Sequence, residues 1–456
     1  MQDEAGSAAT GAFTFSPGLR AGYLAYQLVA HLLVPAALLL VLWRGQREPM
    51  YRRRLPDRLG LSRPGAPGAI WVFAASLGET RAVAPLVREL LARGHDILLT
   101  HSSPAGLAEG GRLFAAEIAA ARLRQAYGPL DLHLAVRAFL RRHRPALGLV
   151  VESEVWPAQL VAARAQGVPM VVINGNLTAR ALARDSRGPG RLRLAFFRAF
   201  TLALTKSPAH VARYVAAGIA PAQVHDVGEL KFDLPVDDAQ IAAARRIGPT
   251  LRAGRAVLMI ASSVEDEEEA LVTILRRLFA GPAPAPLVIW VPRSPQRFAA
   301  VAARTAAEGW HTACRSALLD AGLALRDGAA PSQAPQVIVG DSLGEMDFYY
   351  ALADLVFVGA TLNDLGGHNI IEPLAQDKPV ITGPSIYGIA FPAEEARAAG
   401  ALRVLPDAAA LGDELCRLFA STPDLATFRI AAQGFNTAHR GAARRSADLL
   451  EPLLAR

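Results

Sequence analysis

The chain alternates short apolar runs with amphipathic stretches of helical length, and this alternation starts twice. In the first half, the apolar runs cover residues 69–74, 96–100, 147–152 and 170–174. In the second half, they cover residues 256–261, 287–292, 337–339, 355–358 and 379–382. Strands and helices that alternate in this way predict parallel sheets with helices on both faces. Because 456 residues also exceed what one hydrophobic core usually supports, we predict an α/β protein with two Rossmann-like, doubly wound domains.

A polar stretch between the two halves and an apolar segment near the start set the predicted boundaries. We expect an N-terminal tail (1–20), a membrane anchor (21–43), a basic juxtamembrane segment (44–65), a first Rossmann-like domain (66–235), a linker (236–254), a second Rossmann-like domain (255–430) and a C-terminal helix that packs across the junction (431–456). Open α/β sheets bind ligands outside the carboxyl ends of their strands. We therefore expect the active site in a cleft that both domains face.

The apolar segment 21–43 contains no charged side chain, and roughly 20 such residues span the hydrocarbon core of a bilayer. Seven arginines follow between Arg44 and Arg63, so this short region carries +5 of the chain's formal charge of +7. Arginines at this position predict cytoplasmic catalytic domains. Basicity confined to one segment argues against a nucleic-acid partner. A membrane span is weakened by three residues within the segment, Gln27, His31 and Pro35. A helix that lies on the membrane surface and a buried helix of a soluble protein therefore stay open as alternatives.

Several common cofactor and metal signatures are absent from the sequence. The two cysteines, Cys314 and Cys416, form neither a disulfide framework nor a zinc-binding pattern. The sequence also lacks the phosphate-binding GxxxxGK[ST] element and a dinucleotide GxGxxG after a strand. We predict neither a metal site nor a bound cofactor.

Acidic side chains follow two predicted strands of the first domain. Glu79 stands in Ser76-Leu77-Gly78-Glu79, after the first strand, and is a candidate general base. A glutamate there also favours the helix dipole without any catalytic role. Glu152 and Glu154 follow another strand and alternate onto one face, so both are candidates for the same site. Lys231, in the Gly-Glu-Leu-Lys-Phe-Asp motif at 228–233, is a candidate for stabilising charge on a leaving group.

The second domain contains candidate anion-binding residues. Arg293 follows Pro292 at the end of a predicted strand and suits a phosphate. The stretch 340–346 is a loop that enters a helix. In Gly366-Gly367-His368-Asn369-Ile370-Ile371-Glu372-Pro373, a glycine turn opens a helix, and we expect the glycine N–H groups to approach a phosphate. Glu372 is a candidate acceptor for ribose hydroxyls.

Taken in order, these motifs resemble the 3-deoxy-D-manno-octulosonic acid (Kdo) transferases of Gram-negative bacteria. The resemblance rests on residues 51–54, 76–79, 152–157, 228–233, 292–293, 344–346 and 366–373. It implies a GT-B glycosyltransferase of the inner membrane that inverts the anomeric carbon. The implied donor is CMP-Kdo, and the implied acceptor is the disaccharide lipid A precursor, lipid IVA.

The resemblance also implies roles for individual residues. Glu79 resembles the catalytic base of the family, and Glu152 and Lys231 resemble its transition-state-stabilising groups. The residues that resemble its CMP contacts are Pro292, Arg293, Gly344, Glu345, Met346, Asn369, Ile370, Ile371 and Glu372.

The chain departs from the family pattern at four positions. Val264 and Ser294 stand where histidine is common, Asn176 where arginine is usual, and Glu229 where asparagine is usual. These departures leave a divergent paralogue with another acceptor or another acidic sugar open. A catalytically silent CMP-sugar-binding membrane protein and a GT-B-like sugar-nucleotide epimerase are further alternatives.

Overall fold

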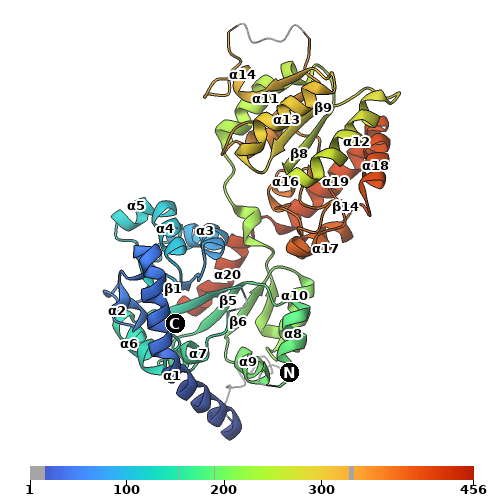
Figure 1. The fold of residues 1–456 in the computed structure, drawn as a ribbon. Helices are drawn as coiled ribbons and strands as arrows, with labels where there is room; N and C mark the ends of the chain where they lie inside the picture. The colour runs from blue at the N-terminus through green and yellow to red at the C-terminus, as the bar shows by residue number, and fades with distance from the viewer. Residues whose placement is uncertain (1–15, 153, 189, 328–332, 456) are drawn as a thin grey trace, which may run out of the picture. The chain divides into compact units, whose positions relative to one another are not determined.

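The computed structural model describes residues 16–152, 154–188, 190–327 and 333–455, and these residues form two compact units (Figure 1). Unit 1 consists of Met1–Leu234 together with Gly441–Arg456, and unit 2 consists of Pro235–Arg440. The predicted tail at 1–20 lies outside the described residues up to position 15.

Unit 1 is built on a parallel seven-stranded sheet with the strand order β3-β2-β1-β4-β5-β6-β7. The strands are β1 (Ile70–Phe73), β2 (Ile97–His101), β3 (Leu123–Tyr127), β4 (Leu147–Val151), β5 (Met170–Gly175), β6 (Leu202–Thr205) and β7 (Val224–Asp226). The helices are α1 (Pro17–Arg47), α2 (Leu55–Arg58), α3 (Leu77–Ala92), α4 (Pro104–Leu113), α5 (Ala115–Ala119), α6 (His133–His143), α7 (Pro157–Ala165), α8 (Ala179–Asp185), α9 (Gly190–Phe197), α10 (Pro208–Ala216) and α20 (Ala442–Leu454), with short 3-10 turns η1 (Pro49–Tyr51), η2 (Pro221–Gln223) and η3 (Leu230–Asp233).

Both faces of this sheet are buried under helices. Along β1, Trp71 and Phe73 enter one apolar cluster, and Ile70 and Val72 enter another on the opposite face. Side chains of a strand alternate between the faces, so a strand buried on both sides has no polar position. This explains why the central strands are continuous apolar runs in the sequence.

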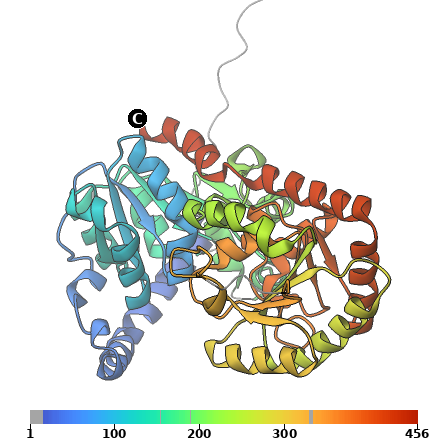
Figure 2. The same ribbon diagram turned by 90° about the horizontal axis from the view of Figure 1, so that it is seen from above.

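Unit 2 contains a second parallel seven-stranded sheet, in the order β10-β11-β9-β8-β12-β13-β14. The strands are β8 (Val257–Ser263), β9 (Leu287–Pro292), β10 (Thr312–Cys314), β11 (Val337–Val339), β12 (Leu355–Val358), β13 (Val380–Thr382) and β14 (Leu402–Val404). The helices are α11 (Asp238–Arg252), α12 (Glu268–Ala280), α13 (Phe298–Ala307), α14 (Arg315–Leu318), α15 (Met346–Leu352), α16 (Ile371–Ala375), α17 (Ala390–Ala398), α18 (Ala408–Ala420) and α19 (Thr422–His439), with 3-10 turns η4 (Glu265–Glu267), η5 (Pro295–Arg297) and η6 (Tyr387–Ile389). In both views the sheets are twisted and lined by helices (Figures 1 and 2). The predicted α/β class with two doubly wound domains is confirmed.

The segment predicted as a linker, 236–254, is mostly helical in the structure. The side chain of Asp237 accepts hydrogen bonds from the N–H groups of Ala239 and Gln240 and so starts α11. Ala243, Ala244, Ile247 and Leu251 are buried. The segment therefore folds as a packed helix of unit 2, and its scattered polar residues occupy the exposed face.

The C-terminal region is two helices rather than the single helix predicted over 431–456. Helix α19 belongs to unit 2 and α20 to unit 1, and Gly441 between them has a left-handed φ of 85°. The carboxylate of Asp233 accepts hydrogen bonds from the N–H groups of Gly441 and Ala443, at 2.6 and 2.7 Å. This cap begins a new helix where the sequence pattern alone continued the old one.

Helix α1 covers the predicted anchor and extends beyond it at both ends. By length and composition it is able to cross a membrane, and it is the one such helix among the described residues. Its N-terminus is capped by the Ser16 hydroxyl, which accepts a hydrogen bond from the N–H of Leu19.

Candidate active site

Glu79 lies in the first turn of α3, directly after β1. The Ser76 hydroxyl accepts a hydrogen bond from the Glu79 N–H at 3.2 Å and donates one to Oε1 of the Glu79 carboxylate at 3.0 Å. The other carboxylate oxygen accepts a hydrogen bond from the N–H of Ala75 at 2.7 Å. Burial, together with the negative charges of Glu152 and Glu154, raises the pKa of Glu79 to about 7. A carboxylate with this pKa is suited to general-base work near neutral pH.

Glu152 and Glu154 follow β4, and the structure brings both within electrostatic range of Glu79. Glu152 has a left-handed φ of 62°. Its backbone is held by two hydrogen bonds, since its N–H donates to the Ile173 carbonyl at 2.9 Å and its carbonyl accepts from the Tyr214 hydroxyl at 3.0 Å. Burial raises the pKa of Glu154, and the charge of Glu152 raises it further. The predicted grouping of acids at the end of this strand therefore exists.

A buried ion pair that the sequence analysis did not identify lies beside Glu152. Lys206, just after β6, is 3% exposed, and its Nζ lies 2.9 Å from Oε2 of Glu229 and 3.5 Å from Oε1 of Glu152. Burial lowers the pKa of Lys206, but the charges of Glu229 and Glu152 outweigh burial and raise it. Burial likewise raises the pKa of Glu229, but the charges of Lys206 and Lys231 outweigh burial and lower it. Both groups are therefore charged, and the glutamate at 229 is balanced by a lysine.

Lys231 lies in η3, next to this pair. Its N–H donates to Oε1 of Glu229 at 3.2 Å, and its charge acts on the Glu229 carboxylate. The N–H of Leu230 donates to Oδ1 of the buried Asn174, the next-to-last residue of β5. The predicted residues Glu79, Glu152 and Lys231 therefore belong to one region of unit 1, at the carboxyl ends of its strands.

In unit 2, Pro292 ends β9 and Arg293 follows it directly, as predicted. The N–H of Arg293 donates to the Ser263 carbonyl at 2.9 Å, and its side chain is exposed. Burial lowers the pKa of His368, and the charge of Arg293 lowers it further. Burial raises the pKa of Glu372, and Arg293 acts on this carboxylate as well. Arg293, His368 and Glu372 therefore share one electrostatic environment.

The interpretation of the glycine turn as a phosphate cradle is wrong for the two glycine amides. The Gly366 N–H donates to the Ser385 hydroxyl at 2.9 Å, and the Gly367 N–H donates to the Ala360 carbonyl at 2.8 Å. Both residues have a left-handed φ, and a Cβ on Gly366 would lie 2.9 Å from the backbone N of Gly388. The glycines are therefore needed for chain conformation and close packing.

Asn369 caps the short helix α16 that follows this turn. Its Oδ1 accepts a hydrogen bond from the Ile371 N–H at 2.9 Å, and its Nδ2 donates to Oε1 of Glu372 at 2.9 Å. The side chains of Asn369 and Glu372 are exposed, while Ile370 and Ile371 are buried. The two polar residues are thus oriented toward each other and remain accessible to a ligand.

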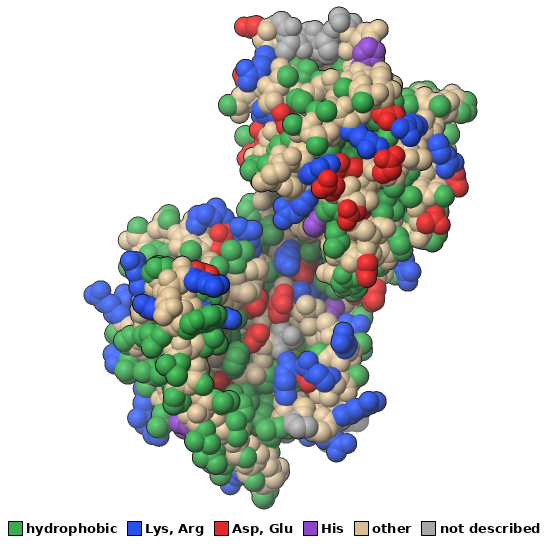
Figure 3. Space-filling view, viewed as in Figure 1, with side chains coloured by type: hydrophobic (Ala, Val, Ile, Leu, Met, Phe, Trp, Pro, Cys, Tyr) green, Lys and Arg blue, Asp and Glu red, His purple; other side chains and the backbone are tan. Residues whose placement is uncertain are grey.

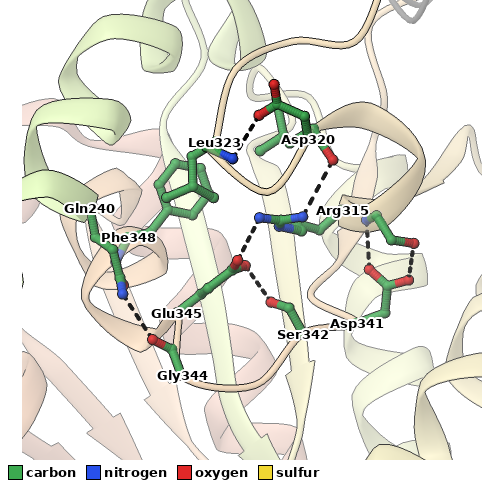
Figure 4. Close-up of polar contacts among 12 residues, drawn as sticks. Gln240, Arg315, Asp320, Leu323, Asp341, Ser342, Gly344, Glu345 and Phe348 are labelled. Carbon is green, nitrogen blue, oxygen red and sulfur yellow. Dashed lines mark hydrogen bonds and ion pairs between the residues drawn. The ribbon is translucent and has the colours of Figure 1, made fainter.

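The loop at Gly344, Glu345 and Met346 is shaped by the Glu345 carboxylate (Figure 4). Arg315 donates to one of its oxygens and the Ser342 hydroxyl to the other, and the figure shows these three side chains pointing toward one another. The Gly344 carbonyl accepts a hydrogen bond from Nε2 of Gln240 at 2.8 Å. Glu345 therefore orders the loop, and Met346 begins α15 with its side chain partly exposed.

Glu267 is a second organising residue that the sequence analysis missed. It is 1% exposed and accepts hydrogen bonds from three consecutive N–H groups, those of Ala360, Thr361 and Leu362, at 2.7, 2.7 and 2.8 Å. It therefore holds the loop after β12 that leads to Gly366 and Asn369. Glu267 stands in a run of five acidic residues at 265–269, and nothing in that run indicates that one of them is buried.

Comparison with known proteins relates the chain to one family. A sequence model described as 3-Deoxy-D-manno-octulosonic-acid transferase (kdotransferase) matches residues 53–234. The 3-deoxy-D-manno-octulosonic acid transferase of Bordetella pertussis is 39% identical, covering 91% of this chain and 95% of that protein. The protein of the same name from Haemophilus influenzae is 30% identical, covering 90% and 93%.

Solved structures support the fold. The UDP-GlcNAc 2-epimerase of Neisseria meningitidis bound to UDP-GlcNAc matches with a TM-score of 0.53 at 11% identity, covering 84% of this chain and all of that one. This likeness concerns the fold alone. The sequence relatives, which are aligned over nearly their whole length, decide the family. The chain belongs to the 3-deoxy-D-manno-octulosonic acid transferases, a family of glycosyltransferases.

Proposed function

We propose that this protein transfers Kdo from CMP-Kdo to the lipid A precursor lipid IVA, with inversion of the anomeric carbon. The observation that carries the proposal is Glu79, an incompletely buried carboxylate with a pKa of about 7 at the carboxyl end of the unit 1 sheet. At neutral pH a large share of it is ionised and able to accept the proton of an acceptor hydroxyl. The name that both sequence relatives share, 3-deoxy-D-manno-octulosonic acid transferase, supports Kdo as the transferred sugar.

In this proposal the acceptor hydroxyl displaces CMP from Kdo in a single step, and residues of unit 1 assist that step. Glu79 removes the proton from the acceptor hydroxyl, and the hydroxyl oxygen attacks the anomeric carbon of Kdo. The bond from that carbon to the CMP phosphate oxygen breaks, and CMP leaves. Glu152 and Lys231 stabilise charge in the transition state, and the buried Lys206–Glu229 pair contacts the Glu152 carboxylate and the backbone of Lys231.

In this proposal unit 2 binds the donor, CMP-Kdo. The exposed guanidinium of Arg293 suits the phosphate of CMP, and the Asn369–Glu372 pair suits ribose hydroxyls. The full set of proposed CMP contacts is Pro292, Arg293, Gly344, Glu345, Met346, Asn369, Ile370, Ile371 and Glu372. Glu345 takes part through the loop conformation it imposes, because its carboxylate is engaged by Arg315 and Ser342.

We further propose that α1 attaches the protein to the inner membrane, with both units in the cytoplasm. The apolar composition of α1 and the arginines between Arg44 and Arg63 support this location. A lipid acceptor such as lipid IVA is available only at a membrane, so membrane attachment of the enzyme is consistent with the proposed acceptor.

The decisive test is transfer from freshly generated CMP-Kdo to tetra-acylated lipid IVA, followed by mass spectrometry of the lipid. We expect a mass gain of one or more Kdo units that is absent with Glu79→Gln. Arg293→Ala should weaken CMP binding at least tenfold, measured by calorimetry, since a charge-assisted phosphate contact is lost. Donor binding without any transfer to lipid IVA would reject this acceptor and favour a paralogue acting on another envelope glycan, and a failure on every acceptor would favour a silent binding protein.

A further inference from the structure

One face of α1 packs on unit 1 in the first half of the helix, and the chain that follows α1 packs against its C-terminal end. The least exposed positions recur every three or four residues, as expected for one face of a helix. The buried positions are Tyr23, Gln27 and Gly45, and those of intermediate exposure are Leu19, Gly22, Tyr26, Ala30, Val34, Ala37, Leu38 and Val41. A Cβ on Gly22 would lie 2.9 Å from Leu192 of α9, and one on Gly45 would lie 2.3 Å from the side chain of Arg52, so packing is close at both ends.

Polar contacts join the first half of α1 to the segment before α6. The Tyr26 hydroxyl donates to Oδ2 of Asp131 at 2.8 Å, and Nε2 of Gln27 donates to the Asp131 carbonyl at 3.1 Å. Oε1 of Gln27 accepts from the His133 N–H at 2.8 Å, and the Tyr23 hydroxyl lies 2.9 Å from Nδ1 of His133. Asp131 and Gln27 are both buried. Gln27, which weakens a membrane span, thus has a partner in the protein.

The chain after α1 returns to the same part of unit 1. The Tyr127 hydroxyl donates to the Met50 carbonyl at 3.2 Å, and Arg54 donates to the Gln125 carbonyl at 2.7 Å. Tyr127 and Asp131 are four residues apart, so their Cα atoms lie within about 14 Å of each other. The two ends of α1 are therefore fixed to the same compact unit.

The opposite face of α1 is apolar and exposed. Leu24 and Leu32 are 67% and 72% exposed, and Leu28, Leu39 and Trp43 are exposed as well. Figure 3 shows hydrophobic side chains gathered over α1. Exposed arginines follow at its C-terminal end: Arg44, Arg47, Arg52 and Arg53. An apolar strip bordered by cations complements the surface of a bilayer that contains anionic phospholipids.

We propose that α1 does not cross the bilayer but lies in the plane of the cytoplasmic membrane surface. Its Leu24–Leu32–Leu39 face enters the acyl layer, and the arginines contact anionic headgroups. A spanning helix would place residues 23–27 and residues 50–57 on opposite sides of a hydrocarbon core of about 30 Å, whereas both segments contact the same unit. The inference rests on the proposed membrane attachment, and it predicts that unit 1 is held at a fixed orientation to the membrane.

Cysteine labelling tests this topology directly. In a Cys314→Ala/Cys416→Ala background, Arg20→Cys and Glu48→Cys place one thiol at each end of α1, at exposed positions. An impermeant maleimide should label both variants in inverted inner-membrane vesicles and neither in right-side-out vesicles. Labelling of Arg20→Cys only in right-side-out vesicles would establish a spanning helix and overturn the proposal.

Vesicle flotation tests the lipid-facing surface. The full-length protein should bind vesicles of phosphatidylethanolamine and phosphatidylglycerol, and Leu28→Asp/Leu32→Asp should weaken binding at least tenfold. Ile430→Asp is a matched control, since Ile430 is 68% exposed on α19 of unit 2. Unchanged flotation of the double variant, or wild-type protein that forms a dimer through this face and does not bind vesicles, would overturn the proposal. If both membrane tests succeed while Kdo transfer fails, the proposed reaction is wrong and the in-plane helix stands.

Discussion

The first strand of each unit leads into a helix in the same way, and in both units a glutamate lies three residues after the start of the turn. After β1, Glu79 accepts hydrogen bonds from the Ala75 N–H and the Ser76 hydroxyl. After β8, Glu267 accepts from the Val264 N–H and from three loop N–H groups that belong to residues 360–362. The same local position therefore holds one carboxylate with two donors and one with four.

The number of donors distinguishes what each carboxylate is suited to do. Glu267 is buried and its oxygens are occupied by the N–H groups of the loop, so it organises structure. Glu79 has fewer hydrogen-bond donors, and it has two acidic neighbours. Burial and the charges of these neighbours raise its pKa to about 7. A carboxylate that is incompletely hydrogen-bonded retains an accessible lone pair and a high proton affinity, which is what a general base needs.

Replacement of Glu79 by glutamine is expected to have the largest effect. Turnover with CMP-Kdo and lipid IVA should fall by about 10³-fold, since removal of a general base typically costs 10²–10⁴-fold. Because the folded-state pKa of Glu79 is raised, its ionised form disfavours folding, and stability is lost as pH rises through about 7. The thermal midpoint of Glu79→Gln at pH 8 should therefore equal or exceed that of the wild type. Glu89→Gln, on the same helix, is the control and should keep full activity; if Glu79→Gln keeps it as well, Glu79 is not the base.

The Lys206–Glu229 pair extends the comparison to a buried carboxylate paired with a cation. Lys206→Met leaves Glu229, 1% exposed, without its main counter-charge and should cost about 3–5 kcal/mol of unfolding free energy. Lys206→Gln/Glu229→Gln removes both charges and should recover most of that loss. Denaturant unfolding gives the energies, and hydrogen exchange of β4–β7 peptides locates them. Equal stability of the single and double variants would show that the pair is not coupled.

Glu267→Gln tests the structural member of the comparison. The amide retains one acceptor oxygen and turns an NH₂ group toward backbone donors, so unit 2 should lose about 2–3 kcal/mol. Hydrogen exchange should accelerate at residues 359–368, and CMP affinity should fall because that loop leads to Asn369 and Glu372. Glu265→Gln, two residues away and 69% exposed, is the matched control. Normal protection of the loop in Glu267→Gln would remove the distinction between the two glutamates.

The pH dependence of activity is the smallest expected effect. With a base of pKa about 7, kcat/KM should rise about tenfold between pH 6 and pH 8, because only ionised Glu79 accepts a proton. Glu152→Gln removes a negative charge that raises this pKa, so the midpoint of the residual activity should move to lower pH. A midpoint that stays in place would mean that Glu152 does not act on Glu79.

Most interior strands of both sheets were predictable from sequence, and the four edge strands were not. The run at 355–358 coincides with β12, and the run at 287–292 coincides with β9. The strands β3, β7, β10 and β14 lie at sheet edges, where positions such as Arg124, Gln125 and Arg403 are polar. An edge strand is solvated on one side, so its sequence loses the continuous apolar pattern. The interior strand β6 was missed as well.

Residues directly after strands were identifiable as site candidates, but their partners were not. Glu79, Glu152 and Arg293 stand at strand ends, where parallel sheets place ligand-binding groups. Lys206 and Glu267 depend on contacts with residues 23 and about 93 positions away, which no local pattern reveals. The glycine turn was predicted at the right place but with the wrong role. Its N–H groups donate to the Ser385 hydroxyl and the Ala360 carbonyl, and neither contact is visible in the local sequence.

The return of α20 to unit 1 has a consequence for biosynthesis. Ala442, Ala443, Ala447 and Leu450 of α20 complete the apolar cluster that contains Val83 and Val87 of α3, the helix that carries Glu79. On the ribosome, that surface of α3 stays uncovered while the roughly 350 residues between α3 and α20 are made, which takes about 17–70 s at about 5–20 residues per second. Unit 2 emerges whole before unit 1 is able to close. A nascent chain stopped before residue 441 therefore contains all of unit 2 but lacks the last helix of unit 1. The packing around the Glu79 helix is complete only after α20 has been made.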